Sequence, residues 1–341
     1  IFALLGLLYF HNHIFIMLIS DNGLVCGEVC VDPHKKPSQE KVLFTHAHSD
    51  HVKLHKDKIF FATPQTNELI KTRYASKIKD KIFNDISFNK KQKFDNFSLE
   101  LAENGHILGS SQVKIVADKD YVITSDFRLK DSLIFKGAKP IKSDVLVLET
   151  TFGSPEYSFP SNEEILPEMI SWIEKNAKSG LVLLSGYSLG KAQELTAIAN
   201  AAGFTPLVHD SIYELNNVYK KFGVKVGKYE KLNHNLKDFN VLIMPPQLVD
   251  RHLFSTIEHF DKRRVASAVA TGWPYKGYFD KIFPLSNHAD YNDLIAYAQA
   301  SDPKLILTDH GFCEEFARKL NRLGFNAKPL KQHKQRRIGE Y

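Results

Sequence analysis

The sequence contains a dense cluster of metal-ligand side chains directly after the apolar run at residues 42–44. Within six positions it places His46, His48, Asp50 and His51. Residues two apart project to the same side of an extended chain, so His46 and His48 can hold one ion from the end of a strand. Asp50 and His51 follow after the chain turns, which suits a second ion beside the first. Two neighbouring ions clamp the attacking and leaving oxygens of a displacement, so the chemistry indicated is hydrolysis.

Five further imidazole and acidic side chains end or follow strand-like apolar runs, or lie in a glycine-flanked turn. They are His106, Asp126, Glu149, His288 and His310. Acidic and imidazole groups rarely end apolar strands without a partner. Taken singly, each is equally explained by an N-cap, a turn or a surface position. Together with the first cluster, they favour a metal site.

The composition is that of an ordinary globular chain. Its 341 residues, 43% of them hydrophobic, are enough for a large core and predict two domains. The net charge of +6 is modest, and a solvated tail or a polyanion contact explains the basic run at residues 331–337. Three cysteines without a disulfide-like framework predict a reducing, cytoplasmic compartment.

Residues 1–16 are largely apolar but too short to span a bilayer. They have no basic n-region and no clear cleavage site, which disfavours a secretory signal. We therefore expect Met17 to be the native start, residues 1–16 to be an upstream extension, and the protein to have no membrane association.

The rest of the chain alternates strand-like and helix-like segments without an obvious repeat, which predicts a layered α/β architecture. Ser161 and Glu164 form a capping-box pattern that opens a helix to about Ala177. A strand-like run at residues 181–184 then leads through a glycine loop at 186–191 into another helical stretch. This order of elements predicts parallel βαβ packing.

From residue 24 to residue 330 the chain resembles the metallo-β-lactamase family in its β-CASP branch. The ordered motifs that carry the resemblance are residues 46–51, the turn at 105–110 and the strand end at 124–127. Asp32 matches the early aspartate that supports the site by hydrogen bonding. The acidic motif and the two histidine motifs that mark the branch are matched by Glu149, His288 and His310.

The resemblance implies an αββα sandwich, the metallo-β-lactamase fold, interrupted by an inserted β-CASP α/β domain. We expect the N-terminal part of the sandwich at residues 17–153, the insertion at 154–281 and the C-terminal part at 282–341. The segment at 185–194 is most similar to the compact nucleases encoded beside DNA ligases and to the related messenger-RNA 3′-end processing factors.

The resemblance also implies two Zn²⁺ ions, with Mn²⁺ left open because carboxylate is present. The implied ligands of one ion are His46, His48 and His106, and those of the other are Asp50, His51 and His310, with Asp126 bridging the two. A hydroxide between the ions would attack phosphorus. His288, oriented and kept protonated by Glu149, would protonate the leaving oxygen. Asp32 and Asp50 complete the expected catalytic set.

Four residues of the expected insertion are candidates for substrate binding, namely Ser188, Gly190, Lys191 and Trp273. The glycine loop opens a helix, so its N–H groups and Lys191 are suited to a phosphate, although a tight turn with a surface lysine is the simpler alternative. Trp273 and its neighbouring aromatics are suited to stacking on bases, and core packing explains them equally well. A single-stranded or frayed nucleic-acid end is the preferred substrate.

We predict a zinc-dependent nuclease that acts as an exonuclease on DNA ends, with an RNA 3′-end processing nuclease as the alternative. The two later histidines favour the RNA-type relatives, whereas the segment at 185–194 favours DNA ends. A thioester or lactam hydrolase and an inactive scaffold are disfavoured, because the branch-specific residues are present and no ligand position is missing. A ligase or helicase partner is suggested by family analogy alone.

Overall fold

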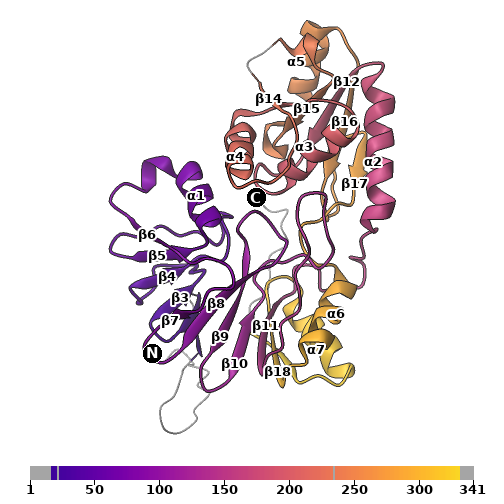
Figure 1. Ribbon diagram of the computed structural model, residues 1–341. Coiled ribbons are helices and arrows are strands. Elements are labelled where there is room, and N and C mark those ends of the chain that lie inside the picture. Colours follow the sequence, from indigo (N-terminus) through magenta and orange to yellow (C-terminus); the bar gives the residue numbers. More distant parts are fainter. Residues whose placement is uncertain (1–16, 21–22, 233–234, 331–341) are drawn as a thin grey trace. The chain divides into compact units, whose positions relative to one another are not determined.

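The computed structural model describes residues 17–20, 23–232 and 235–330. The upstream extension expected at 1–16 and the basic run at 331–337 lie outside these residues. The structure is a mixed α/β protein (Figure 1), so the expected α/β class is confirmed. Within the described residues, no helix has the length and hydropathy needed to span a membrane.

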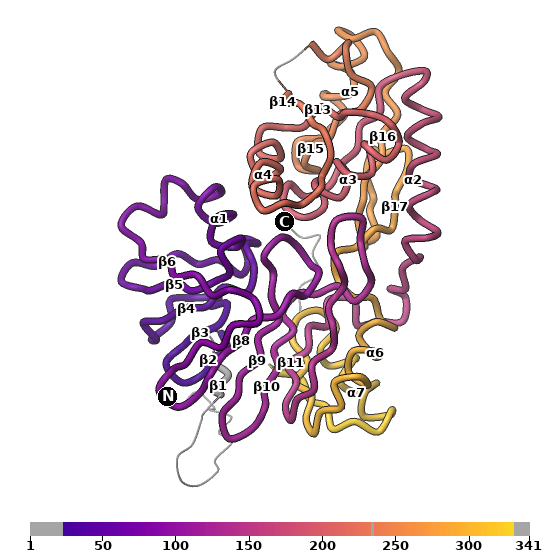
Figure 2. Tube along the Cα trace, in the orientation of Figure 1, coloured from indigo at the N-terminus to yellow at the C-terminus, as the bar shows by residue number. Residues whose placement is uncertain are grey.

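The chain forms two compact units. Within the described residues, the first unit consists of the chain from Met17 to Leu129, Gly137–Ser158 and His288–Leu330. The second unit consists of Lys130–Lys136 and Phe159–Asn287. Figure 2 traces the chain through both units.

The first unit contains a six-stranded sheet. In spatial order its strands are β1 (Met17–Ser20), β2 (Gly23–Cys26), β3 (Val29–Val31), β4 (Lys41–Leu43), β5 (Ile59–Ala62) and β6 (Ile82–Asp85). Strands β3 to β6 are parallel, so their carboxyl ends meet at one edge. Asp32 follows β3, and the loop that carries residues 46–51 follows β4.

The second sheet of this unit has seven strands. In spatial order they are β19 (Ala327–Pro329), β18 (Leu305–Asp309), β11 (Val145–Glu149), β10 (Asp120–Ile123), β9 (Ser111–Val116), β8 (Ser98–Glu103) and β7 (Gln92–Lys93). Strands β10, β11 and β18 are parallel neighbours, and Glu149 pairs in register with Asp309. The residues that follow β10, β11 and β18 are therefore brought to one edge of the sheet.

The core of the first unit lies between these two sheets. Val31 and Leu43 from one sheet pack with Val113 and Val147 from the other. Residues on the opposite face of β11, such as Leu146, pack against helices α6 (Tyr291–Ser301) and α7 (Cys313–Arg322). Helix α1 (Pro64–Arg73) lies beside β5 and β6 (Figure 1). This alternation of buried side chains on β11 is the period of two expected for a strand covered on both faces.

The second unit is built on a six-stranded sheet in which every strand pair is parallel. In spatial order its strands are β14 (Glu230–Lys231), β13 (Leu207–Val208), β15 (Val241–Met244), β12 (Leu181–Ser185), β16 (Val265–Ala270) and β17 (Lys281–Phe283). Its helices are α2 (Asn162–Ala177), α3 (Lys191–Ala201), α4 (Asp210–Lys221) and α5 (Arg251–Asp261). Its described connections include two 3₁₀ turns, at Leu236–Asp238 and Pro246–Leu248, whereas a third, at Ala75–Lys77, lies in the first unit.

Two local predictions for this unit are confirmed. The Ser161 backbone N–H donates to Glu164 Oε2 at 2.8 Å, and α2 ends at Ala177 as the pattern predicts. The strand β12, the glycine loop and α3 form the expected start of a parallel βαβ unit. Helices α2 and α3 cover one face of the sheet, because their apolar residues share a core cluster with Val182 and Ile243.

The turn that presents His106 in the first unit depends on a glycine. Gly109 has a φ of +76°, and its carbonyl accepts hydrogen bonds from the hydroxyls of Thr63 at 2.7 Å and Thr66 at 2.9 Å. A Cβ at this position would lie 2.6 Å from the Thr66 backbone nitrogen. No side chain fits there unless this backbone moves.

We expect Gly109→Ala to lower the free energy of unfolding by about 1–3 kcal/mol more than Gly324→Ala, because it adds a steric clash to the backbone cost. Gly324 is the matched control, since its φ is +91° but nothing lies within 4 Å of the position that an added Cβ would take. Gly324→Ala should lower the free energy of unfolding by only the ~1–2 kcal/mol that a non-glycine residue costs in a left-handed conformation. Urea denaturation followed by circular dichroism measures both, and equal losses would contradict the role assigned to the turn.

Candidate metal centre

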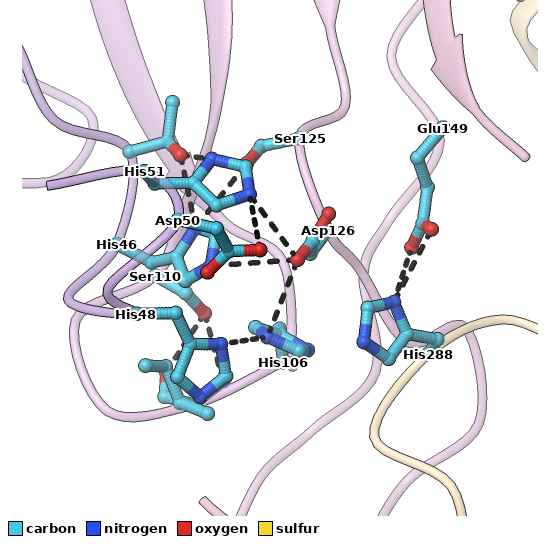
Figure 3. A network of polar contacts seen from close by, with 12 residues as sticks. His46, His48, Asp50, His51, His106, Ser110, Ser125, Asp126, Glu149 and His288 are labelled. Atoms are coloured by element: carbon cyan, nitrogen blue, oxygen red, sulfur yellow. Dashed lines mark hydrogen bonds and ion pairs between the residues drawn. The ribbon is translucent and has the colours of Figure 1, made fainter. Parts of the chain in front are cut away.

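The loops at the carboxyl ends of β4 and β10, together with the turn after β8, bring six of the seven predicted ligands together (Figure 3). Four of them form a group whose ligand atoms all lie within 4.8 Å of one another: His46, His48, His106 and Asp126. His106 Nε2 lies 3.1 Å from His48 Nδ1, and Asp126 Oδ2 lies 3.4 Å from His46 Nε2. Three imidazoles and one carboxylate form a ligand set that Zn²⁺ prefers.

A buried polar atom in this group has no hydrogen-bond partner. Within the described residues, His46 Nε2 makes no hydrogen bond, and the His46 ring is fully inaccessible to solvent. Buried polar atoms in folded proteins are almost always satisfied, and each exception needs an explanation. A metal ion held between His46 and the neighbouring ligand atoms would supply the missing partner, so these residues fit a metal.

A second set of ligands continues from the first through Asp126. His51 Nε2 lies 3.5 Å from Asp126 Oδ2 and 3.8 Å from Asp50 Oδ2. The ring of His310 stacks on that of His51 at a centroid distance of 5.5 Å, while its Nδ1 lies 3.2 Å from Asp309 Oδ2. The structure thus places His310 beside His51, but His310 is not part of the tight four-residue group.

Asp32 supports the candidate ligands through hydrogen bonds to His51 and to Thr45, the residue before His46. Its carboxylate accepts hydrogen bonds from His51 Nδ1 at 2.8 Å, from the Thr45 backbone N–H at 2.8 Å and from the Thr45 hydroxyl at 2.5 Å. With Nδ1 of His51 engaged, its Nε2 is the nitrogen left to face Asp126. Such outer partners fix the orientation and tautomer of a ligand histidine.

Thr45 belongs to the centre, although the sequence motifs did not single it out. Its hydroxyl lies 3.1 Å from His46 Nδ1 and 2.6 Å from the Ser125 hydroxyl. It therefore links Asp32 to the ring of the most buried ligand. The sequence feature that could have identified Thr45 is its position between an apolar strand and the first histidine. A small hydroxyl side chain there can form hydrogen bonds with neighbouring polar groups.

Three residues of the centre have left-handed backbones. Asp32, Ser125 and His310 have φ values of 43°, 51° and 59°. None is glycine, and each lies within two residues of a strand end. Residues in this region cost free energy and cluster at functional sites.

The protonation states suit metal binding in the four-residue group. Burial lowers the pKa of His46 and lowers that of His106 well below its usual value, so both rings are neutral. Burial alone would raise the pKa of Asp126, but the neighbouring His51 and His288 hold it well below its usual value. The carboxylate is therefore ionised, as a ligand must be.

The two histidines of the second set behave differently. Burial alone would lower the pKa of His51, but the carboxylates of Asp126 and Asp32 raise it well above its usual value. The Asp309 carboxylate raises the pKa of His310 to about 9. Both rings therefore carry protons that a metal ion would have to displace.

His288 and Glu149 form a pair next to Asp126. His288 Nδ1 lies 3.2 Å from each carboxylate oxygen of Glu149, and these two residues form a further close group with Asp126. Glu149 Oε1 also accepts the Phe127 backbone N–H at 2.8 Å, while the Phe127 carbonyl accepts the Ala289 N–H at 2.6 Å. The peptide groups of Phe127 thus hold both members of the pair.

The candidate substrate-binding residues lie in the second unit. Lys191 is 5% exposed, and its ammonium donates to the Leu285 carbonyl at 2.7 Å, so it is neither a surface lysine nor suited to the expected phosphate contact. The Gly190 N–H donates to Gln193 Oε1 at 2.7 Å. The Ser188 hydroxyl lies 3.2 Å from that of Ser211, and Trp273 is half-buried.

The chain is similar to several proteins of known name. It is 30% identical to a probable DNA ligase of Opitutus terrae over 88% of the chain, 24% identical to RNase aCSPSF2 of Saccharolobus solfataricus over 69%, and 24% identical to the human DNA cross-link repair 1A protein over 77%. It spans 30%, 47% and 27% of these relatives, respectively. No family model matches the chain.

A solved structure has the same fold. A protein of unknown function from Enterococcus faecalis superposes with a TM-score of 0.62 at 15% sequence identity, covering 88% of this chain and 82% of that one. At this identity the likeness bears on the fold alone.

We expect Asp126→Asn to lower the zinc retained after dialysis to less than roughly half, because this carboxylate contacts the rings of three candidate ligands. Zinc at 100 times Kd should stabilise the wild type by about 2.7 kcal/mol, and this gain should shrink in the variant. Atomic emission and thermal denaturation measure the two effects. Asp302→Asn, at a carboxylate 80% exposed, is the control. Full zinc retention by Asp126→Asn would show that the ligand group is assigned incorrectly.

Proposed function

Because the chain belongs to the β-CASP branch of the metallo-β-lactamase family, we infer that it is a metal-dependent hydrolase that cleaves phosphodiester bonds of nucleic acid. The names of its relatives, a DNA ligase, RNases and DNA cross-link repair proteins, all refer to nucleic acid. The observation that carries the proposal is the His288–Glu149 pair beside the ligand group, because it adds a proton donor to a metal centre.

We propose that the first unit is the metallo-β-lactamase domain. Its order of layers supports this, since two packed sheets have helices α6 and α7 on one outer face and α1 beside the other sheet. We propose that the second unit is the inserted β-CASP domain, expected at residues 154–281. Its wholly parallel sheet supports the assignment, and so does the order of the sequence, in which residues 159–287 separate two stretches of the first unit.

Zn²⁺ is the metal we propose, because imidazole is the main ligand, and Mn²⁺ remains the alternative because carboxylates take part. His46, His48 and His106 would hold one ion, Asp50, His51 and His310 the other, and Asp126 would contact both. Bound metal would supply Lewis acidity toward a phosphoryl oxygen and toward water. Asp32 and Thr45 would keep the ligand rings in place.

We propose that His288 is the general acid. Glu149 engages Nδ1 of the ring, so Nε2 is the nitrogen that passes a proton to the leaving oxygen. The carboxylate fixes the orientation of the ring. Asp126, which lies in the same close group, keeps this donor next to the metal ligands.

DNA ends are the substrate we propose first, and a single-stranded or frayed end is the preferred form. The 30% identity with a probable DNA ligase over 88% of the chain supports DNA, and also an association with a ligase. The 24% identity with RNase aCSPSF2 supports the alternative, RNA 3′-end processing. We further propose a cytoplasmic location, because Cys26, Cys30 and Cys313 form no disulfide bond in the described part of the chain.

With zinc-loaded protein and matched, end-labelled single-stranded DNA and RNA, we expect DNA to be shortened progressively from one end. Asp50→Ala should abolish this activity, because Asp50 is a proposed ligand of the second ion. A time course resolved on a denaturing gel is the measurement. Preferential cleavage of RNA would support the RNA-processing alternative. Cleavage of neither would overturn the proposal and favour a small-molecule hydrolase or an inactive scaffold.

We expect His288→Ala to lower kcat about 10²–10⁴-fold, the usual contribution of a positioned general acid, with zinc content unchanged. Single-turnover cleavage together with metal analysis tests this. His259→Ala, at an exposed histidine of α5, is the control and should change neither quantity. Unchanged turnover in a fully metallated His288→Ala variant would rule out the assigned role.

A further inference from the structure

We propose that Glu194 and Asn287 are positioning residues for His288, a role that rests on the proposed function. Asn287 ends the second unit and is joined by its peptide bond to His288, which begins the last stretch of the first unit. Glu194 lies in the first turn of α3, 93 positions away along the chain. Through this hydrogen bond, a helix of the second unit holds the backbone that leads directly into the general acid.

Two side chains of α3 hold this backbone. Glu194 Oε1 accepts a hydrogen bond from Asn287 Nδ2 at 2.8 Å, and Lys191 Nζ donates to the Leu285 carbonyl at 2.7 Å. Lys191 and Glu194 are three positions apart and therefore lie on the same face of the helix. Two of the three residues before His288 are thus fixed to a single helical turn.

These contacts are deeply buried. Glu194 is 2% exposed, Lys191 5% and Asn287 8%. Lysine and glutamate are almost never buried to this degree unless they are paired, because desolvation is costly. Gly186 makes room for the lysine, since a Cβ there would lie 2.5 Å from Lys191 Cγ. Since apolar side chains of similar volume often replace buried charged groups without loss of stability, we assign Lys191 and Glu194 the role of fixing the direction of this backbone.

The backbone on the other side of His288 is also fixed. The Ala289 N–H donates to the Phe127 carbonyl at 2.6 Å, and Asp290 caps α6 by accepting the Asp293 N–H at 2.9 Å. The position of the imidazole therefore depends on anchors on both sides. A misplacement of 1 Å in a catalytic group can cost about 10²-fold in rate. Loss of the α3 anchor should reduce proton donation and leave the metal ligands in place.

This reasoning predicts a dependence on the leaving group. In hydrolysis, an oxygen from water bonds to phosphorus, the bond from phosphorus to the leaving oxygen breaks, and that oxygen takes the proton from His288 Nε2, while the proton lost by water passes to solvent. A p-nitrophenolate group leaves without protonation, whereas a phenolate group needs the proton more. Loss of positioning should therefore slow the phenyl ester selectively.

The experiment compares zinc-loaded, full-length variants on methyl p-nitrophenyl phosphate and methyl phenyl phosphate. We expect Asn287→Ala to lower kcat for the phenyl ester about tenfold or more, with KM, zinc content and the p-nitrophenyl rate within about twofold of wild type. Glu194→Met, which keeps the volume but loses the acceptor, should behave in the same way. Glu194→Gln keeps Oε1 and should restore the wild-type ratio. Combined with His288→Ala, Asn287→Ala should cause no further loss.

The matched control is Asn216→Ala. Asn216 is fully buried and accepts a 2.8 Å hydrogen bond from Gln193, also on α3, in a contact that does not involve residues 285–288. Asn216→Ala should leave the ratio of the two ester rates unchanged. If Asn287→Ala does not fold, Glu194→Met tests the same hydrogen bond from its other side.

An equal loss of kcat on both esters in Asn287→Ala and Glu194→Met, or no loss on either ester, would overturn the positioning role. Wild-type protein that hydrolyses the esters but no DNA or RNA would overturn the proposed function, while the ratio between the esters would still test the positioning role. Wild-type protein that hydrolyses none of these substrates would overturn both.

Discussion

The centre depends on one buried carboxylate, that of Asp126, placed among imidazole rings. Removing a carboxylate from water costs several kcal/mol even after the protein relaxes. Its neighbours offset this cost, because His51 and His288 hold the pKa of Asp126 well below its usual value. The nitrogens of His46, His51 and His106 lie 3.4 to 3.8 Å from a single oxygen of Asp126. This compensation works only if strands of both sheets end at the same place. The topology of the first unit can therefore be understood as the means of placing these groups around one oxygen.

Much of the centre could be predicted from the sequence, because its information is local. The spacing within residues 46–51, the glycine-flanked turn and the side chains that end apolar strands placed all four members of the group that the structure assembles among the candidate ligands. Their assignment to one ion or the other came from the family resemblance. The capping box at Ser161 and Glu164 was likewise readable, since both partners lie within one turn. The expected α/β class follows from the alternation of periodicities. Each of these signals links residue types to a geometry that does not depend on distant parts of the chain.

The features that could not be predicted depend on contacts between distant parts of the chain. A lysine after a glycine loop has the same local pattern whether it faces solvent or the interior. What distinguishes Lys191 is the Leu285 carbonyl, 94 positions away. Likewise, Thr45 acts through Ser125, 80 positions away, and the pattern around Thr45 gives no register between β4 and β10. Such partners become known only when the tertiary structure brings the segments together.

The left-handed backbones of Asp32, Ser125 and His310 have a consequence for how this protein can change. Each conformation costs of order 1–3 kcal/mol, and the surrounding hydrogen bonds must maintain it. Glycine at Ser125 or His310 would relieve the cost but remove a group from the site. Selection for thermal stability alone would therefore favour substitutions that damage the centre. The strand ends around the metal ligands are where stability and activity make opposite demands on the sequence.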